Sequence, residues 1–258
     1  MIKIKSHTHY ADLLWILAKT DFKLRYHGSI LGFLWVLLKP LSIFLVLNFV
    51  FRNIFGRGLE HYSVRLLTGI ILWTYFSEAT RVGMTTLLTK ASLITKIATP
   101  KLVLLVASHL NSLWSFLINL GVLTVFYITD GVYPSGTALL SFLILALLTM
   151  MTVFSITLIT APLFVHFRDL DQIWEVLLTA GFYAAPIIYP LSIFPENRQW
   201  LLYFNPMTPI IQEAKSILVD GNPLSLQLIT ILAGGNILVL VASLLFFKQS
   251  SRRSAERI

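Results

Sequence analysis

Six long apolar stretches dominate this sequence, and no other feature constrains its fold as strongly. They occupy residues 30–51, 66–88, 102–128, 137–165, 173–189 and 224–247. As a helix, the first stretch would be about 33 Å long, which exceeds the roughly 30 Å hydrocarbon core of a bilayer. We therefore predict an all-α integral membrane protein with six transmembrane helices, folded as one domain over residues 1–258.

Composition excludes the main alternatives. Hydrophobic residues make up 56% of the 258 residues and charged residues 12%. That charged share is about half of the roughly 25% in an ordinary soluble domain. Mean hydropathy is +0.78, which also excludes a disordered chain. Because the sequence has no cysteine, it offers no disulfide, thiolate metal site or cysteine nucleophile.

Basic residues give the predicted topology. The net charge is +8, but Lys and Arg lie mainly in short segments between apolar stretches, which favours membrane topology over nucleic-acid binding. With the N-terminus inside, the cytoplasmic side would hold fourteen of them: Lys3, Lys5, Lys19, Lys23, Arg25, Lys39, Lys90, Lys96, Lys101, Arg168, Lys248, Arg252, Arg253 and Arg257. The outer side would hold five: Arg52, Arg57, Arg65, Arg198 and Lys215. This excess predicts that both termini are cytoplasmic.

Three segments do not have the pattern of a membrane span. Residues 8–27 place apolar, aromatic and basic side chains in separate bands of one helix, as an amphipathic helix in the membrane interface does. This helix is either an anchor alone or also a contact for a cytoplasmic partner. Residues 85–100 suit a short cytoplasmic helix, and Pro100 marks either its end or the start of the next helix. Residues 191–223 contain short apolar pieces broken by prolines, which predict re-entrant helices between spans five and six.

The sequence lacks familiar catalytic motifs. No G-x-x-x-x-G-K-[ST] run is present, so no P-loop binds ATP, and we predict neither catalytic residues nor a metal site. Asp169-Leu170-Asp171 is similar to the D-x-D of metal-dependent glycosyltransferases, but residues two apart do not face each other on a helix. We interpret it as a helix start paired with Arg168. Glu78 and Arg81, three residues apart, predict a local ion pair.

Aromatic and glycine residues suggest further contacts. The expected substrate-pathway residues are Trp73, Tyr75, Phe76, Tyr183, Tyr189 and Tyr203. Aromatic faces can stack on sugar rings, although interfacial belts are the other explanation for such residues. Within this set, Tyr183 and Tyr189 are the preferred lining pair because they flank Pro186. The glycines of Gly28-x-x-x-Gly32 predict a close approach between helices.

At this point the sequence resembles a known family, the ABC-2 type permeases of polysaccharide exporters. The resemblance is carried by the run FKLRYHGSILGFLW at 22–35, by FRDLDQI at 167–173, by FYAAPIIYP at 182–190 and by NPM at 205–207. It extends over roughly residues 10–247. Two departures stand out, since Ala98 and Thr99 replace a usual aromatic pair and Ala185 replaces a usual Ser or Thr.

The resemblance implies a half-transporter. Two copies would form one channel across a bacterial inner membrane, driven by a separate dimeric ABC ATPase that binds ATP and Mg²⁺, with no cofactor in this chain. The implied cargo is a lipid-linked polysaccharide such as an O-antigen-like chain, carried from cytoplasm to periplasm. The ATPase-coupling residues would be Lys90, Leu93, Ile94, Lys96 and Ile97. The cytoplasmic gate or lipid-head-group residues would be Lys23, Arg25, Lys39 and Arg168.

Three other functions compete with this one. A related ABC-2 protein could export lipids or drugs instead of polysaccharide. A membrane-embedded glycosyltransferase would rest on Asp169 and Asp171 alone, and changing both to Asn would then abolish metal-dependent sugar transfer. A passive channel would show flux without ATP or a partner.

The topology yields a first prediction. A reporter fused after Ile258 should behave as cytoplasmic, because the bias of fourteen basic residues to five orients the spans. The measurement is a paired fusion of a reporter active only in the cytoplasm and one active only outside it. A periplasmic reporter signal would overturn the six-span topology.

Overall fold

The computed structural model describes residues 7–25, 28–97 and 99–253, and every regular element in these ranges is helical. Within them the α-helices are α1 (His7–Arg25), α2 (Trp35–Phe55), α3 (Tyr62–Thr89), α4 (Ala91–Ile97), α5 (Lys101–Thr129), α6 (Gly136–His166), α7 (Leu170–Ala184), α8 (Met207–Leu218) and α9 (Leu226–Arg253). Four 3₁₀ segments are η1 (Gly32–Leu34), η2 (Gly56–Gly58), η3 (Leu191–Ile193) and η4 (Glu196–Phe204). The helical fold class is therefore confirmed.

Local chemistry sets the helix boundaries. Ser135 caps α6, since its Oγ accepts the backbone N–H of Ala138 at 3.1 Å. Gly131 turns the chain between α5 and α6 with a φ of 74°, a conformation that favours glycine. Helix α7 ends at Ala184 rather than continuing to residue 189. The reason is Pro186, which disfavours helical backbone at the residue before it.

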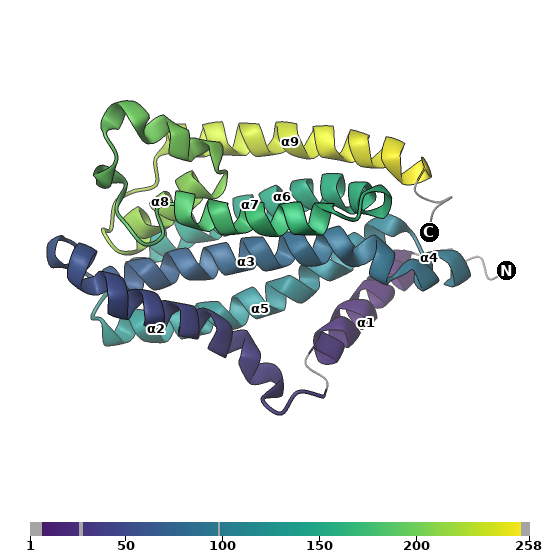
Figure 1. The fold of residues 1–258 in the computed structure, drawn as a ribbon, viewed down its shortest axis with the longest axis horizontal. Helices are drawn as coiled ribbons and strands as arrows, with labels where there is room; N and C mark the ends of the chain where they lie inside the picture. Colours follow the sequence, from purple (N-terminus) through teal and green to yellow (C-terminus); the bar gives the residue numbers. More distant parts are fainter. Residues whose placement is uncertain (1–6, 26–27, 98, 254–258) are drawn as a thin grey trace.

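Helix α3 forms the centre of the bundle. It packs against α5 and α6, and more briefly against α2 and α8. Figure 1 shows α3 running through the middle of the molecule, with α7 and α9 on one side and α2 on the other. Most α3 residues are buried, and its apolar side chains form the main hydrophobic cluster together with side chains from α5, α6 and α8. The core therefore depends on one helix that other helices enclose.

Four helices in the described ranges are long and apolar enough to cross a membrane. They are α5, α6, α9 and the stretch Gly32–Phe55, which contains α2. Helix α3 has sufficient length but carries Glu78 and Arg81, while α7 has 15 residues and a length of about 22 Å, less than a hydrocarbon core. The apolar helices agree with an integral membrane protein. The six-span count stays a prediction for α3 and α7.

The first and last described helices meet at the same end of the bundle. The start of α1 and the end of α9 both lie at the right of Figure 1, with α4 and the α6–α7 connection. Lys101, at the start of α5, donates from its Nζ to the backbone oxygen of Ser251 near the end of α9. We term this the terminal end. The opposite end, which holds η2, η4 and α8, is termed the loop end.

The connection between α1 and α2 differs from the sequence prediction. Gly28 and Gly32 have φ values of 81° and 46°, in the left-handed region that favours glycine. No atom lies within 4 Å of a Cβ built on either residue. Within the described chain no helix therefore approaches these two glycines closely, and both turn the backbone.

Close helix contact occurs instead at two other glycines. A Cβ on Gly83 of α3 would lie 2.5 Å from Cγ2 of Thr157 on α6. A Cβ on Gly181 of α7 would lie 2.7 Å from Cη2 of Trp73 on α3. Small residues let helices approach closely in membranes, so these two positions set the spacing of α3 to α6 and of α7 to α3.

Substitution of Gly83 should therefore loosen the bundle. We expect Gly83→Val to destabilise the folded protein by about 1–3 kcal/mol, because the new side chain overlaps Thr157. The matched control is Gly121→Val on α5, where a Cβ meets no atom within 4 Å. Thermal unfolding in detergent should show a lower midpoint for Gly83→Val than for Gly121→Val. Equal midpoints would contradict the close α3–α6 contact.

Candidate functional site

Two ion pairs fasten α1 to α3 and to the residue that follows α3, at the terminal end. Arg25 Nη1 pairs with Glu78 Oε1, and Lys90 Nζ pairs with Asp21 Oδ2. Asp21 and Arg25 are four residues apart on α1, so both side chains lie on one face of that helix. The four side chains are 15–29% exposed, which shields them from solvent screening more than a surface pair. Helix α1 is therefore tied electrostatically to the central helix.

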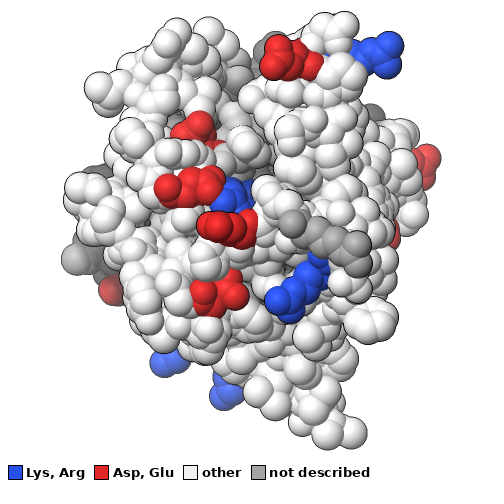
Figure 2. Space-filling model, turned by 90° about the vertical axis from the view of Figure 1, so that its left-hand side faces the viewer, with Lys and Arg blue, Asp and Glu red and all other residues white. Residues whose placement is uncertain are grey.

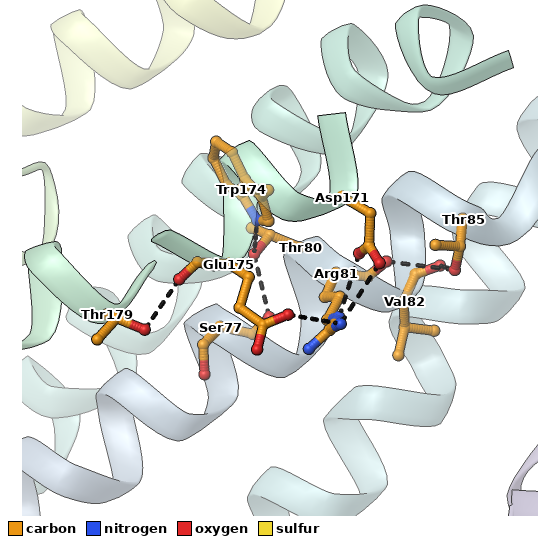
Figure 3. Close-up of polar contacts among 9 residues, drawn as sticks. All are labelled: Ser77, Thr80, Arg81, Val82, Thr85, Asp171, Trp174, Glu175 and Thr179. Atoms are coloured by element: carbon orange, nitrogen blue, oxygen red, sulfur yellow. Dashed lines mark hydrogen bonds and ion pairs between the residues drawn. The ribbon is translucent and has the colours of Figure 1, made fainter. Parts of the chain in front are cut away.

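A second polar group joins α3 to α7. In Figure 3, Arg81 of α3 points toward two carboxylates of α7: its Nε lies 3.3 Å from Asp171 Oδ1, and its Nη2 lies 3.1 Å from Glu175 Oε2. On the same helix, Trp174 Nε1 donates to Thr80 Oγ1 at 3.1 Å. Asp171 and Glu175 are one helical turn apart, so a single guanidinium reaches both. Three neighbouring contacts thus fix the register of α7 on α3.

These contacts correct two sequence predictions. Glu78 and Arg81 do not pair with each other, since Glu78 binds Arg25 and Arg81 binds Asp171 and Glu175. The predicted pairing of the Asp169–Asp171 motif with Arg168 is also wrong for Asp171. The guanidinium of Arg168 instead lies 5.9 Å from the ring centroid of Phe164, a cation–π distance. Glu78, Arg81 and Asp171 thus each pair with an opposite charge on another helix.

The expected coupling residues fall into two groups. Lys90 is engaged by Asp21, and Ile94 packs against the hydrophobic cluster formed by Leu87, Leu105 and Leu158. Leu93 is half-buried, whereas Lys96 is exposed and Ile97 is 53% exposed. Lys96 and Ile97 therefore lie on the outward surface of α4, whereas Lys90 and Ile94 attach this segment to the bundle.

The expected gate residues are dispersed. Lys23 and Lys39 are exposed on α1 and α2, and Arg168 is exposed just before α7. Arg25 differs from these, because it is partly buried and bonded to Glu78. The four residues thus come from three parts of the chain: α1, α2 and the connection between α6 and α7.

The aromatic residues of α3 lie inside the bundle. Trp73, Tyr75 and Phe76 are 6%, 4% and 4% exposed. Trp73 packs edge-on against Phe182 of α7 with ring centroids 6.2 Å apart, and Tyr75 lies 4.6 Å from the ring of Phe116 on α5. In this conformation the three rings are packing residues between helices rather than an accessible lining.

The other expected pathway residues lie nearer the loop end. Tyr183 is 60% exposed and Tyr203 is 47% exposed. Tyr189 is half-buried, and its hydroxyl donates to the backbone oxygens of Tyr183 at 2.8 Å and Ala184 at 3.1 Å. These carbonyls belong to the last turn of α7, where no further helical N–H is available. Tyr189 therefore caps α7, while Tyr183 and Tyr203 present accessible rings.

A buried lysine supports the chain break after α7. Lys215 of α8 is 8% exposed, and its Nζ donates to the backbone oxygens of Pro186 at 2.5 Å and Ile187 at 3.0 Å. A Cβ on Gly69 of α3 would lie 3.1 Å from Cγ2 of Ile187 and 3.4 Å from Lys215 Cε, so the small residue lets α3 pack closely against the segment that the lysine binds. Burial, with the nearby charge of Arg65, lowers the pKa of Lys215 to about 7. The lysine satisfies carbonyls that the broken helix leaves unpaired.

Charged residues gather at the loop end. Arg65 at the start of α3 pairs with Asp220 beyond α8, with one contact, from Nη1 to Oδ2, at 3.0 Å. His61 Nδ1 lies 2.9 Å from Asp130 Oδ2. Figure 2 views this end and shows several Asp or Glu side chains around a recessed Lys or Arg. The acidic and basic groups of this end are therefore interleaved rather than separated.

Sequence reasoning missed the roles of Arg81 and Lys215. A signal was available for each. Asp171 and Glu175 are like charges four residues apart on α7, so they required a cation from elsewhere. Lys215 interrupts the apolar face of a short helix that follows the proline-broken segment, where unpaired carbonyls needed a donor.

The described residues show no metal centre. They contain no group of three or more His, Asp or Glu side chains that could hold a metal ion. Asp171 is held by Arg81, and Asp169 begins α7, where its carbonyl accepts the N–H of Ile173 at 3.1 Å. The structure thus gives Asp171 an ion pair through its side chain and gives Asp169 a backbone hydrogen bond at the helix start.

Comparison with known proteins identifies relatives of this chain. Residues 12–219 match the ABC-2 type transporter family. A relative from Klebsiella pneumoniae, named O-antigen export system permease protein RfbA, is 28% identical over 256 residues, which cover 99% of this chain and 98% of the relative. A protein of the same name from Myxococcus xanthus is 29% identical over 251 residues, or 96% of each chain. Both relatives thus match along nearly their whole length.

The α1–α3 ion pairs yield a charge-exchange prediction. Asp21→Lys alone and Lys90→Asp alone each set like charges together, so each should lower the thermal unfolding midpoint by about 2–4 °C. The double variant restores an opposite pair and should recover most of the loss. Lys96→Asp, on an exposed side chain with no ionic partner among the described residues, is the control and should leave the midpoint unchanged. A double variant as unstable as the sum of the two single variants would argue against the pairing.

Proposed function

The chain belongs to the ABC-2 type transporter family, and we propose that it is the membrane-spanning subunit of an ATP-driven exporter of lipid-linked polysaccharide. The observation that carries the proposal is its match over almost the full length of relatives named as O-antigen export permeases. The cargo would be an O-antigen-like chain, moved from the cytoplasm to the periplasm of a bacterial cell.

The proposed subunit performs no bond chemistry itself. A separate dimeric ABC ATPase would bind ATP and Mg²⁺ and hydrolyse the nucleotide. Its contact with the membrane subunit would lie at the terminal end, where α4 exposes Lys96 and Ile97. Helix α1 is tied to α3 at the same end by Arg25–Glu78 and Asp21–Lys90. A push on α1 or α4 would therefore reach the central helix directly. In this arrangement both termini are cytoplasmic.

The export path would form between two copies of this chain. Helix α7 supports this arrangement, because none of its residues is buried in the single chain and Ile173, Val176, Leu177 and Tyr183 are 44–67% exposed. Polysaccharide would slide past accessible rings such as Tyr183 and Tyr203, which offer weak and repeated stacking. The enclosed rings of Trp73, Tyr75 and Phe76 would instead hold α3 in place.

Transport by the reconstituted complex tests the proposal. The chain should co-purify with an ATPase that has a P-loop, and proteoliposomes of the pair should move lipid-linked polysaccharide only when ATP is present. Ile97→Asp should lower this export about tenfold or more, because an exposed apolar anchor contributes most to such an interface. The measurement is ATP-dependent polymer transfer at matched amounts of membrane protein.

The control for this experiment is Lys96→Asp, one residue away. An exposed charge contributes roughly 0–1 kcal/mol, so its export should fall much less than that of Ile97→Asp. Full export by Ile97→Asp would show that the end of α4 is not the ATPase contact. Flux without ATP would indicate a passive channel, and transfer of lipid or drug but not of polysaccharide would indicate a related exporter.

A further inference from the structure

A cleft at the loop end lies apart from the expected coupling residues and shares only Tyr189 with the expected substrate-pathway residues. Its volume is about 260 Å³. It lies between the start of α3, the backbone of residues 187–190 and one face of α8. The lining side chains that carry the argument are Tyr62, Arg65, Tyr189, Gln212, Lys215 and Asp220. Because α3 and α8 pack together and α7 ends next to them, rigid elements form the walls.

Helix α8 supplies unsatisfied donors to this cleft. Gln212, Lys215 and Ser216 follow a spacing of three and four residues, so they share one face of the helix. Gln212 is half-buried, and its side-chain amide has no hydrogen-bond partner among the described residues. When Lys215 is protonated, its Nζ uses two of its three hydrogens on Pro186 and Ile187, which leaves one without a partner there. The cleft therefore retains hydrogen-bonding capacity.

The charges of the cleft select the class of ligand. Arg65 and Lys215 provide donors, but the Asp220 carboxylate, paired with Arg65, provides acceptors beside them. A phosphate accepts only and would face the carboxylate, whereas a metal cation would face the ammonium and guanidinium. Hydroxyl groups both donate and accept, so a neutral polyhydroxylated molecule fits both kinds of group.

The aromatic residues of the cleft also favour a small polyhydroxylated ligand. The hydroxyls of Tyr62 and Tyr189 are engaged by backbone oxygens, of Ile188 for Tyr62 and of Tyr183 and Ala184 for Tyr189. Their rings are thereby held in fixed positions where they line the cleft. A fixed apolar surface beside a few convergent polar groups is the usual form of a small-ligand site.

We propose that this cleft binds one sugar unit of a glycan, with Gln212 and the third N–H of Lys215 hydrogen-bonded to its hydroxyls. The inference deepens the proposed function and rests on it for the source of the sugar, which would be the exported chain. The cleft would lie near the exit of the export path. With a sugar unit bound, it would retain the emerging glycan between successive ATP cycles.

Binding by the purified chain tests this site. The full chain is placed in lipid nanodiscs and titrated with oligosaccharide fragments cut from the surface polysaccharide of its source cell, followed by ligand-observed NMR. Wild type should bind saturably, and Gln212→Ala should weaken binding about threefold to tenfold, as expected for one lost hydrogen bond. Since Gln212 bonds to no described residue, the substitution should leave folding intact.

The matched control is Gln227→Ala, the same change on an exposed residue of α9 outside the cleft. It should bind like wild type. Equal binding by Gln212→Ala, absence of saturable binding to wild type, or displacement of the glycan by inorganic phosphate would each overturn the sugar site. Export is scored separately in proteoliposomes with the ATPase. If ATP-driven export is intact but the chain shows no glycan binding that depends on Gln212, only this inference is refuted. If the glycan binds but no ATP-driven export occurs, the proposed transport is refuted.

Discussion

The rest of the structure depends on one constraint, which is that the polar side chains of α3 must find partners inside the protein. Helix α3 is enclosed by α2, α5, α6 and α8, and an unpaired charge in such surroundings is costly. Glu78 is satisfied by α1, and Arg81 by two carboxylates of α7. The neighbours of α3 are thus placed by charge as well as by apolar packing, and α7 has its register set mainly by this interaction.

Helix α7 is attached to α3 at two places, by polar contacts near its start and by a packing contact near its end. Its first turns bind Arg81 and Thr80 through Asp171, Glu175 and Trp174. Its last turns touch α3 where Gly181 meets Trp73. No α7 residue is buried between these points. In the proposed exporter, α7 is therefore the element that could change its neighbours at least cost, while α3 stays fixed.

Much of the fold was predictable from the sequence, because long apolar runs have few alternatives to a membrane helix and prolines end helices locally. The partners of charged residues were not. The i, i+3 rule assigned Glu78 to Arg81, but each found a partner on a helix more than fifty residues away in the sequence. The roles of the aromatic residues could not be predicted from the sequence for a similar reason. Trp73 and Tyr183 look equally suited to a core or to a pathway, and only tertiary packing buries the first and exposes the second.

The positions of the charges on α3 explain why α1 and α7 contact this helix. Arg65 and Glu78 are thirteen residues apart, which is about 20 Å along a helix and shorter than a hydrocarbon core of roughly 30 Å. If Arg65 lay at one membrane surface, Glu78 and Arg81 would lie within the apolar layer. Lipid cannot solvate them there, so protein must. The antiparallel helix α7, about 22 Å long, covers nearly the same interval and brings its two carboxylates to the level of Arg81. Its short length, which is less than a hydrocarbon core, therefore matches the interval of α3 that carries these charges.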